Sequence, residues 1–242
     1  MEFFNLVWEL ICKYWILILQ GVGNTMLVAL ISTVLGLIIG IIVGVIRTIP
    51  ESKSKPIAIL QKIINFILSA YIEIFRGTPM MVQSMVIFWG YAFIAHQYLP
   101  LFGSAILIVS INTGAYIAEI VRGGIISIDK GQFEGAKAIG MNHFQLMFFV
   151  VIPQVIRNIL PSVSNEFVIN IKDTSVLNVI GFDELFYYAD IMSLSGKVFP
   201  TFAIISVVYF ILTFTVTRIL LLIEKWLDGK DSYEKESVSG VE

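Results

Sequence analysis

The chain has 242 residues, of which 57% are hydrophobic and only 14% are charged, and its mean hydropathy is +0.86. Soluble domains usually carry about a quarter charged residues, so the excess apolar surface must face lipid, and we expect an all-α integral membrane protein. The formal net charge of −2 provides no basic surface for nucleic acid, the single cysteine excludes an internal disulfide, and two histidines far apart in the sequence do not form a metal-binding pattern.

The amino-terminal segment is expected to be retained and to lie at the membrane surface. Its uncharged run, residues 14–46, is much longer than the apolar core of a signal peptide. As a helix this run would span roughly 50 Å, against about 30 Å of hydrocarbon. A less hydrophobic, glycine-containing stretch, residues 20–24, places the start of the first span near Thr25. Residues 1–20 are predicted to form an interfacial helix. Its aromatic anchors would be Trp8, Tyr14 and Trp15.

Five segments are predicted to cross the membrane within a transmembrane domain of residues 21–224. A charged break follows the first span, and parity then requires one net crossing within the long apolar stretch 57–101. We assign this crossing to about 79–99, with residues 57–75 lying at the cytoplasmic interface or extending the same helix. The remaining predicted spans are residues 104–121, 150–171 and 202–223.

The distribution of charge predicts the orientation. Lysine and arginine gather after the first span, within residues 122–137 and in the tail 225–242, whereas residues 173–199 are mainly acidic. Positively charged loops stay in the cytoplasm. We therefore expect a multi-pass protein of the cytoplasmic membrane, with its amino terminus outside and residues 225–242 as a cytoplasmic tail.

The first span carries a small residue at every fourth position, namely Ser32, Gly36, Gly40 and Gly44. On a helix these residues form one ridge along which another backbone can approach closely. The spacing predicts a packing seam against another span or subunit.

The segment 129–153 is predicted to form a helix, a turn and a second helix at the inner face of the membrane. Asp129 followed by Gln132 is typical of a helix N-cap with a reciprocal partner, and a short helix over residues 130–139 can end at Gly140 in the left-handed conformation.

The second helix of this segment repeats the capping pattern with Asn142 and Gln145, and Pro153 marks its bend into the next span. Because this arm is strongly apolar, we expect it to bury against a partner. Its apolar residues are Phe144, Leu146, Phe148 and Phe149.

Residues 129–153 resemble the EAA loop of permease subunits of bacterial ABC importers, whose pattern is E-A-A, three residues, G, nine residues and I-x-L-P. The chain departs from this pattern mildly, with Gly135, Val150 and Ile152 in place of Ala, Ile and Leu. Three further segments, FRGTP (75–79), NTGAYIAEIVRGGI (112–125) and NIKDTSVLNVIG (170–181), are similar to the subfamily that imports polar amino acids. The matching loop residues are Glu134, Ala136, Gly140 and Pro153.

The resemblance implies five transmembrane helices plus a cytoplasmic EAA loop, as in type I ABC importers. In that family the loop inserts as a coupling helix into a cleft of a separate ATPase subunit. The chain has no GxxxxGK[ST] phosphate loop, so we expect no enzyme activity and no cofactor, with ATP and magnesium bound by the partner ATPase. The residues assigned to coupling are Glu134, Gly135, Ala136, Gly140 and Pro153.

The resemblance also implies the partners. A chain with five spans is too small to enclose a path alone, so we expect a second permease subunit, identical or homologous, within the lipid bilayer. An extracytoplasmic solute-binding protein would deliver the polar amino acid. Glutamine, arginine, histidine, glutamate and cystine all remain open as substrates.

Polar residues inside the predicted spans are candidates for the substrate path, because polar groups at membrane depth tend to face a cavity or a partner. One stripe lies in the third span, and another lies in the fourth with Glu166 beside it. The alternative interpretation is that these groups only join helices through hydrogen bonds. The candidates are Glu73, Arg76, Asn112, Tyr116, Glu119, Asn158, Ser162, Asn165, Lys172 and Asp173.

Three other functions compete with this interpretation. A proton-coupled carrier could use Glu119 and Glu166, but a five-span chain without internal repeats is short for that class. A membrane-embedded enzyme would need a convergent set of nucleophile, base or metal ligands, which the sequence does not present. An ABC permease for sugars or metals is the nearest alternative, and only the resemblance of residues 75–79 and 170–181 disfavours it.

Overall fold

The computed structural model describes residues 2–228, and every regular element within this range is helical. Five helical segments are long and apolar enough to cross a membrane, which confirms the predicted all-α membrane fold with five spans. These segments are α1 (Glu2–Ile46), α2 (Lys55–Gly77), α4 (Leu101–Ile126), the stretch His143–Ile180 with α7 (Ile152–Asp173) at its centre, and α9 (Val198–Asp228). Most of the predicted cytoplasmic tail, residues 225–242, lies outside the described residues.

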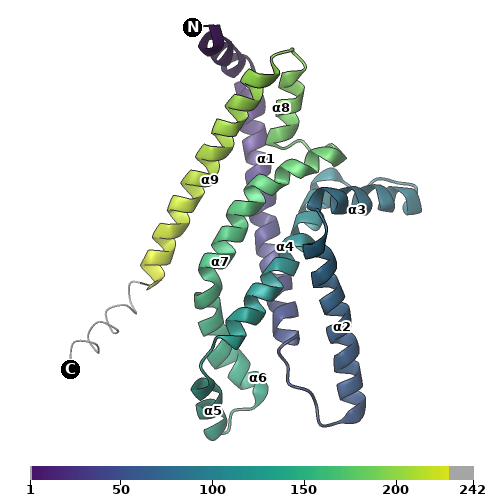
Figure 1. Ribbon diagram of the computed structural model, residues 1–242, viewed down its shortest axis with the longest axis vertical. Coiled ribbons are helices and arrows are strands. Elements are labelled where there is room, and N and C mark those ends of the chain that lie inside the picture. Colours follow the sequence, from purple (N-terminus) through teal and green to yellow (C-terminus); the bar gives the residue numbers. More distant parts are fainter. Residues whose placement is uncertain (1, 229–242) are drawn as a thin grey trace, which may run out of the picture.

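Shorter helices cap the two ends of the bundle and project from its side. Figure 1 shows α1 along the long axis of the molecule, with α5 and α6 at one end and α8 near the other, while α3 extends sideways from the body. A π-helical turn, Met147–Val151, joins α6 to α7, and a 3-10 segment, Thr174–Ile180, follows α7. The short helices are α3 (Met80–Ala95), α5 (Lys130–Ala138), α6 (His143–Leu146) and α8 (Leu185–Ser193).

The second crossing is α2, so the assignment of a span to residues 79–99 was wrong. The helix α3 has 16 residues and is therefore only about 24 Å long, shorter than the hydrocarbon core. The chain breaks ahead of it because Thr78, which precedes Pro79, is held in an extended conformation. Glu73 and Arg76 lie in the last two turns of α2, where they leave most of the helix free to face lipid.

The helix α1 is continuous over 45 residues. It runs without interruption through the less hydrophobic residues that precede Thr25. The predicted interfacial helix and the first span therefore form a single helix about 68 Å long. That residues 1–20 lie at the membrane surface stays a prediction.

The small-residue ridge on α1 packs against α4, which confirms the predicted seam. A Cβ atom added at Gly36, Gly40 or Gly44 would come within 2.5–2.9 Å of side-chain atoms of α4, distances that real Cβ contacts do not show. Side chains longer than hydrogen would therefore push the two helices apart. The contacted side chains on α4 are Thr113, Ile117 and Val121.

The end of the molecule opposite α5 and α6 is organised around a buried carboxylate, Glu184. Its oxygens accept hydrogen bonds from the backbone N–H groups of Phe186 (2.8 Å) and Tyr187 (2.7 Å), so it caps α8. The Tyr209 hydroxyl of α9 donates a third hydrogen bond at 2.8 Å. Burial raises the pKa of the Glu184 carboxyl from 4.5 to about 7, although these hydrogen bonds act in the opposite direction.

We predict that Gly40→Ala destabilises the protein, whereas Gly23→Ala in the same helix does not. A methyl group at Gly40 would collide with Ile117, while one at Gly23 meets nothing within 4 Å. Overpacking of this kind costs about 1–3 kcal/mol, and replacing an unhindered helical glycine is neutral or slightly stabilising. The measurement is the midpoint of thermal unfolding in detergent. Equal midpoints for the two variants would contradict the seam.

We further predict that Glu184 makes stability depend on pH. Because the pKa is higher in the folded state than the usual 4.5, the folded protein binds the extra proton between pH 4.5 and about 7. The associated stabilisation is complete below pH 4.5 and is lost as the pH rises through about 7, and it amounts to about 3 kcal/mol in total. Unfolding midpoints measured across this range should fall with rising pH in the wild type, and Glu184→Gln should flatten the curve. A Glu51→Gln control, at an exposed site, should keep the slope of the wild type.

Candidate functional site

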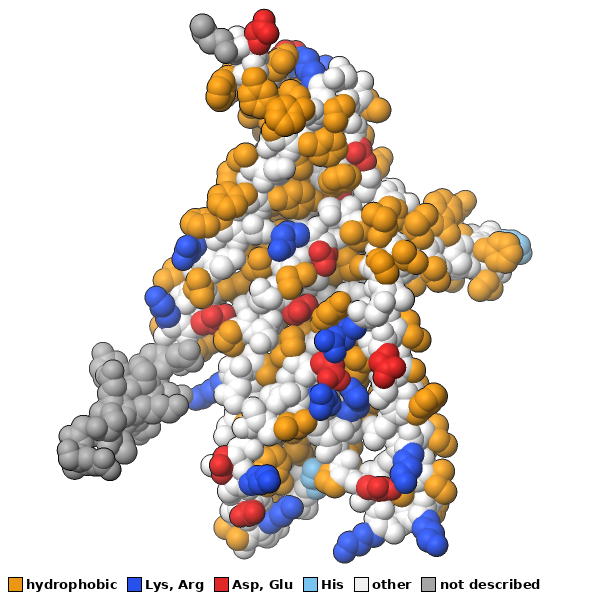
Figure 2. Space-filling model, viewed as in Figure 1, with side chains coloured by type: hydrophobic (Ala, Val, Ile, Leu, Met, Phe, Trp, Pro, Cys, Tyr) orange, Lys and Arg blue, Asp and Glu red, His pale blue; other side chains and the backbone are white. Residues whose placement is uncertain are grey.

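A polar cavity of about 300 Å³ lies where the break between α2 and α3 meets α4 and α7. Figure 2 shows acidic and basic side chains at mid-height on one face of the molecule, and a second group of them at its lower end. Five charged or polar side chains of α4 and α7 line the cavity together with the start of α3. The lining residues are Thr78, Pro79, Met80, Asn112, Tyr116, Glu166, Ile169, Asn170 and Asp173.

The α4 wall is fixed by hydrogen bonds to the α2–α3 break. The side chain of Asn112 is buried, and its Nδ2 donates to Gln83 Oε1 (2.9 Å) and to the carbonyl of Phe75 (3.3 Å). One turn further along, the ring of Tyr116 lies under the Arg76 guanidinium, with 5.4 Å between the guanidinium carbon and the ring centroid. Arg76 therefore stands at the edge of the cavity.

The α7 wall is fixed by Asn170, which joins three spans. Its Nδ2 donates to Thr33 Oγ1 of α1 at 2.8 Å, and its Oδ1 accepts from Thr113 Oγ1 of α4 at 3.0 Å. Glu166 and Asp173 lie one turn before and about one turn after Asn170, so all three share a face of α7. Within the part of the chain that the structure describes, neither carboxylate makes a hydrogen bond or an ion pair.

The structure brings only some of the predicted path residues together. Asn112, Tyr116 and Asp173 line the cavity, and Arg76 borders it. The remaining predicted residues of α7 lie on other faces, and Asn165 lines a separate groove of about 230 Å³ between α7 and α9. Arg76 and Asn165 are exposed and absent from the cavity lining, and so are Glu73, Asn158, Ser162 and Lys172.

Sequence reasoning gave too little weight to the stripe that faces the cavity. Glu166, Asn170 and Asp173 recur at helical spacing, but Glu166 was considered only as a neighbour of the other stripe and Asn170 was not considered at all. The helical period of three to four residues was the available signal. It did not reveal which face of α7 would meet α4.

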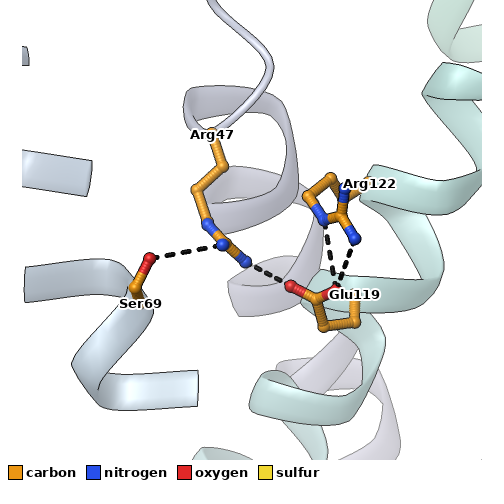
Figure 3. Close-up of polar contacts among 4 residues, drawn as sticks. All are labelled: Arg47, Ser69, Glu119 and Arg122. Carbon is orange, nitrogen blue, oxygen red and sulfur yellow. Dashed lines mark hydrogen bonds and ion pairs between the residues drawn. The ribbon is translucent and has the colours of Figure 1, made fainter. Parts of the chain in front are cut away.

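Glu119 is held in an ion network and does not line the cavity. Figure 3 shows its carboxylate between the guanidinium groups of Arg47 and Arg122, with Arg47 also bonded to Ser69 of α2. Arg122 donates from Nε and Nη2 to Glu119 Oε2 at 3.1 and 2.9 Å. The network therefore ties the end of α1 to α2 and α4.

The predicted helix–turn–helix at residues 129–153 is present with its caps. Asp129 Oδ1 accepts from the backbone N–H of Gly131 at 2.7 Å, and Gly140 ends the first helical arm with a φ of +81°. Asn142 and Gln145 form a complete capping box, with hydrogen bonds of 2.9 and 3.0 Å. The reciprocal partner expected of Asp129, Gln132, instead accepts from the side chain of Gln154 at 3.3 Å.

The junction between this element and α7 is a π-helical turn, which the sequence did not predict. The N–H of Ile152 donates to the carbonyl of Met147, five residues earlier, and Pro153 follows in the first turn of α7. The predicted bend at Pro153 is thus preceded by a turn with one additional residue.

The helix pair of α5 and α6 has one apolar surface that is buried and another that is exposed. Ala136 and Leu146 are buried in the same cluster as Val151 of the π-helical turn. Glu134 and Gly135 are exposed, and so are three phenylalanines, two of which stack with 6.0 Å between their ring centroids. The exposed phenylalanines are Phe144, Phe148 and Phe149.

Comparisons with known proteins find similarity along most of the chain. The family described as "Binding-protein-dependent transport system inner membrane component" matches residues 57–229. The "L-cystine transport system permease protein TcyB" of Bacillus subtilis is 33% identical over 225 residues, which cover 91% of both chains. The "Glutamine transport system permease protein GlnP" of Escherichia coli is 34% identical over 165 residues, which cover 67% of this chain and 75% of the relative.

Solved structures share the fold. A chain from the "Crystal structure of an amino acid ABC transporter with histidines" superposes with a TM-score of 0.77 and 35% identity, covering 89% of this chain and 96% of that chain. An inward-facing structure of the MetNI methionine ABC transporter has a TM-score of 0.73 at 19% identity, covering 88% of this chain and 97% of that chain. The second likeness concerns the fold alone.

We predict that Glu119→Gln lowers the stability of the protein by about 2 kcal/mol, because two partly buried guanidinium groups lose their counter-charge. Glu51→Gln is the matched control, since Glu51 pairs with Lys62 at an exposed site, where loss of an ion pair costs about 0–1 kcal/mol. The measurement is again the unfolding midpoint in detergent. A Glu119 variant as stable as the control would contradict a structural role for the network.

Proposed function

This chain belongs to the family of inner membrane components of binding-protein-dependent transport systems, and we propose that it is the permease subunit that carries a polar amino acid into the cell in an ATP-driven importer. The observation that carries the proposal is the combination, in one five-span chain, of a polar cavity between the spans with a capped helix pair at one end of the bundle. The similarity to permeases named for glutamine and cystine supports the substrate class.

The energy comes from a partner. The relatives are named as permease proteins, and the sequence contains no GxxxxGK[ST] phosphate loop. ATP and magnesium are therefore bound by a separate ATPase subunit. The family implies an ATPase, a second permease and a binding protein as the other members of the assembly.

The helix pair of α5 and α6 is the docking element for the ATPase in this proposal. Glu134, Gly135 and Ala136 occupy α5, Gly140 sets the turn, and Pro153 lies where the pair continues into α7. The exposed phenylalanines beside them supply the apolar surface that a cleft on the ATPase would cover. Two helix caps make this surface rigid before it binds, which lowers the entropic cost of docking.

The orientation follows from the same assignment. With α5 and α6 in the cytoplasm, the amino terminus lies outside and the carboxyl terminus lies inside, as the distribution of lysine and arginine also favours. The α8 end then faces the extracytoplasmic binding protein, to which it presents the exposed carboxylate of Asp183.

A second permease subunit, identical or homologous, completes the path. The cavity opens at the surface of a single chain, between helices that leave much of their apolar side chains uncovered. Two such chains related by a two-fold axis would enclose a route that one chain leaves open.

We predict that Glu134→Lys and Gly140→Pro each lower recruitment of the ATPase by about tenfold or more, with insertion into the membrane unchanged. The first reverses a charge on the exposed face of α5, and the second removes the residue whose φ of +81° sets the turn. The readout is the amount of ATPase that co-purifies with the permease in mild detergent.

Glu51→Lys is the control for this experiment, because it makes the same charge change in the loop between α1 and α2. It should leave co-purification of the ATPase at the level of the wild type. Unchanged recruitment by both the Glu134 and the Gly140 variants would remove the coupling assignment.

A further inference from the structure

The helix α3 and the turn that follows it, residues 80–100, form an arm that stands away from the rest of the molecule. Figure 1 shows α3 extending sideways from the body, and Figure 2 shows the same projection covered mainly by hydrophobic side chains. One side of this α3 arm packs on the body through Phe88, which is buried in the same cluster as Val28 of α1. The far end is uncovered, with Phe93 and Ile94 exposed by 81% and 80%.

The α3 arm lies well inside the bundle along the direction of the spans. Ile18 of α1 packs in the same cluster as Ile205, which is near the start of the apolar span α9. Val28, which packs against α3, lies about 15 Å further along α1 towards the α5–α6 end. This distance is about half the thickness of the hydrocarbon core, so the arm is at membrane depth.

The turn at the end of the α3 arm leaves polar groups of the backbone without partners. The helix ends at His96, and the chain then folds back so that Tyr98 stacks on Phe88 with 6.0 Å between the ring centroids. Among the described residues, none accepts a hydrogen bond from the backbone N–H groups of Gln97, Tyr98 and Leu99. Irregular backbone at membrane depth is tolerated only where it is buried in protein or meets water.

The side chains of α3 do not suit a surface that meets water. Gln83 and Ser84 are buried against the body, where Gln83 donates hydrogen bonds to the carbonyls of Phe75 (2.9 Å) and Thr78 (2.8 Å). The outward faces of the helix are therefore apolar, which is typical of a helix that is enclosed on every side. Lipid could cover these faces, but it cannot satisfy the backbone of the turn, so the α3 arm requires a protein partner.

The position at which the α3 arm begins indicates which protein covers it. Thr78, Pro79 and Met80 line the polar cavity, so the arm starts at the edge of a cavity that opens at the surface of the single chain. The second permease that closes this cavity in the proposed function therefore meets the arm as well. A second copy of the chain has the same open cavity and the same uncovered arm, and a two-fold axis would pair both features.

We propose that the α3 arm is the contact through which a second copy of this chain pairs with the first, with each arm reaching across the two-fold axis onto the other copy. The inference rests on the proposed function, and it assigns the second permease subunit to an identical chain. In this pair the turn at residues 96–100 is buried in protein, which removes the unsatisfied backbone from lipid.

Photo-crosslinking in membranes tests which molecule touches the α3 arm. Cells that contain the ATPase produce two differently tagged copies of the permease, each with p-benzoylphenylalanine in place of Phe93. Irradiation should join both tags in one product of twice the 27.1 kDa mass of the chain. The matched control carries the probe at Phe210, which is exposed on α9 on the opposite side of the body (Figure 1), and it should not join the tags. An adduct of the Phe93 probe with lipid alone, or with a different polypeptide, would overturn the inference.

A larger side chain distinguishes a packed protein contact from fluid lipid. Ile94→Trp should lower the fraction of two-copy complexes, measured by native mass spectrometry, by about fivefold or more, because a packed contact has no room for the added atoms. Ile211→Trp makes the same change at an exposed site on α9 and should keep the wild-type fraction, since lipid adapts to it. Equal fractions in the two variants would contradict the proposed contact.

Uptake of radiolabelled amino acids by the complete importer in proteoliposomes separates the inference from the proposed function. ATP-dependent uptake of a polar amino acid by an importer whose Phe93 probe reaches only lipid would refute the contact and leave the proposed function intact. Failure to recruit an ATPase, together with no ATP-dependent uptake of any of the common amino acids, would refute the proposed function itself.

Discussion

Glycine at every fourth position of α1 allows its backbone to approach α4 until added Cβ atoms would collide with side chains of that helix. In a membrane, where water does not drive helices together, such close packing is a principal source of association. The contact fixes α4 on α1, and Asn170 then attaches α7 through Thr33 and Thr113. The cavity lies between α4, α7 and the start of α3, so the α1–α4 contact affects its shape by fixing the position of α4.

The charged residues within the spans fall into two groups with different surroundings. Glu119 lies between Arg47 and Arg122, so its negative charge is neutralised by ion pairs within the protein. Glu166 and Asp173 form no close ion pair with a described residue, and Arg76 and Lys172 attract them only from a longer distance. The first arrangement joins helices through paired charges, whereas the second leaves two partly buried carboxylates facing the cavity.

Local chemistry made some parts of this structure predictable. The caps at Asp129 and Asn142 and the left-handed Gly140 depend only on neighbouring residues, and the glycine ridge of α1 depends only on spacing, so both were predicted correctly. The second span and the α7 wall of the cavity were not predicted correctly. Pro79, which follows α2, determines where that helix ends. The face of α7 that meets α4 is selected by hydrogen bonds of Asn170 to residues that lie far from it in the sequence. Such contacts have no signature in the local pattern.

The π-helical turn at Met147–Val151 has a mechanical consequence for the bundle. Its backbone bonds, such as that from Ile152 to Met147, can be exchanged for the tighter bonds of an α-helix with little loss of hydrogen bonding. That exchange would rotate the preceding helix by about 100° around the axis of α7, the angle that one residue occupies. A rotation of α5 and α6 can thus be accommodated at this turn while the backbone of α7, which carries Glu166 and Asp173, stays helical.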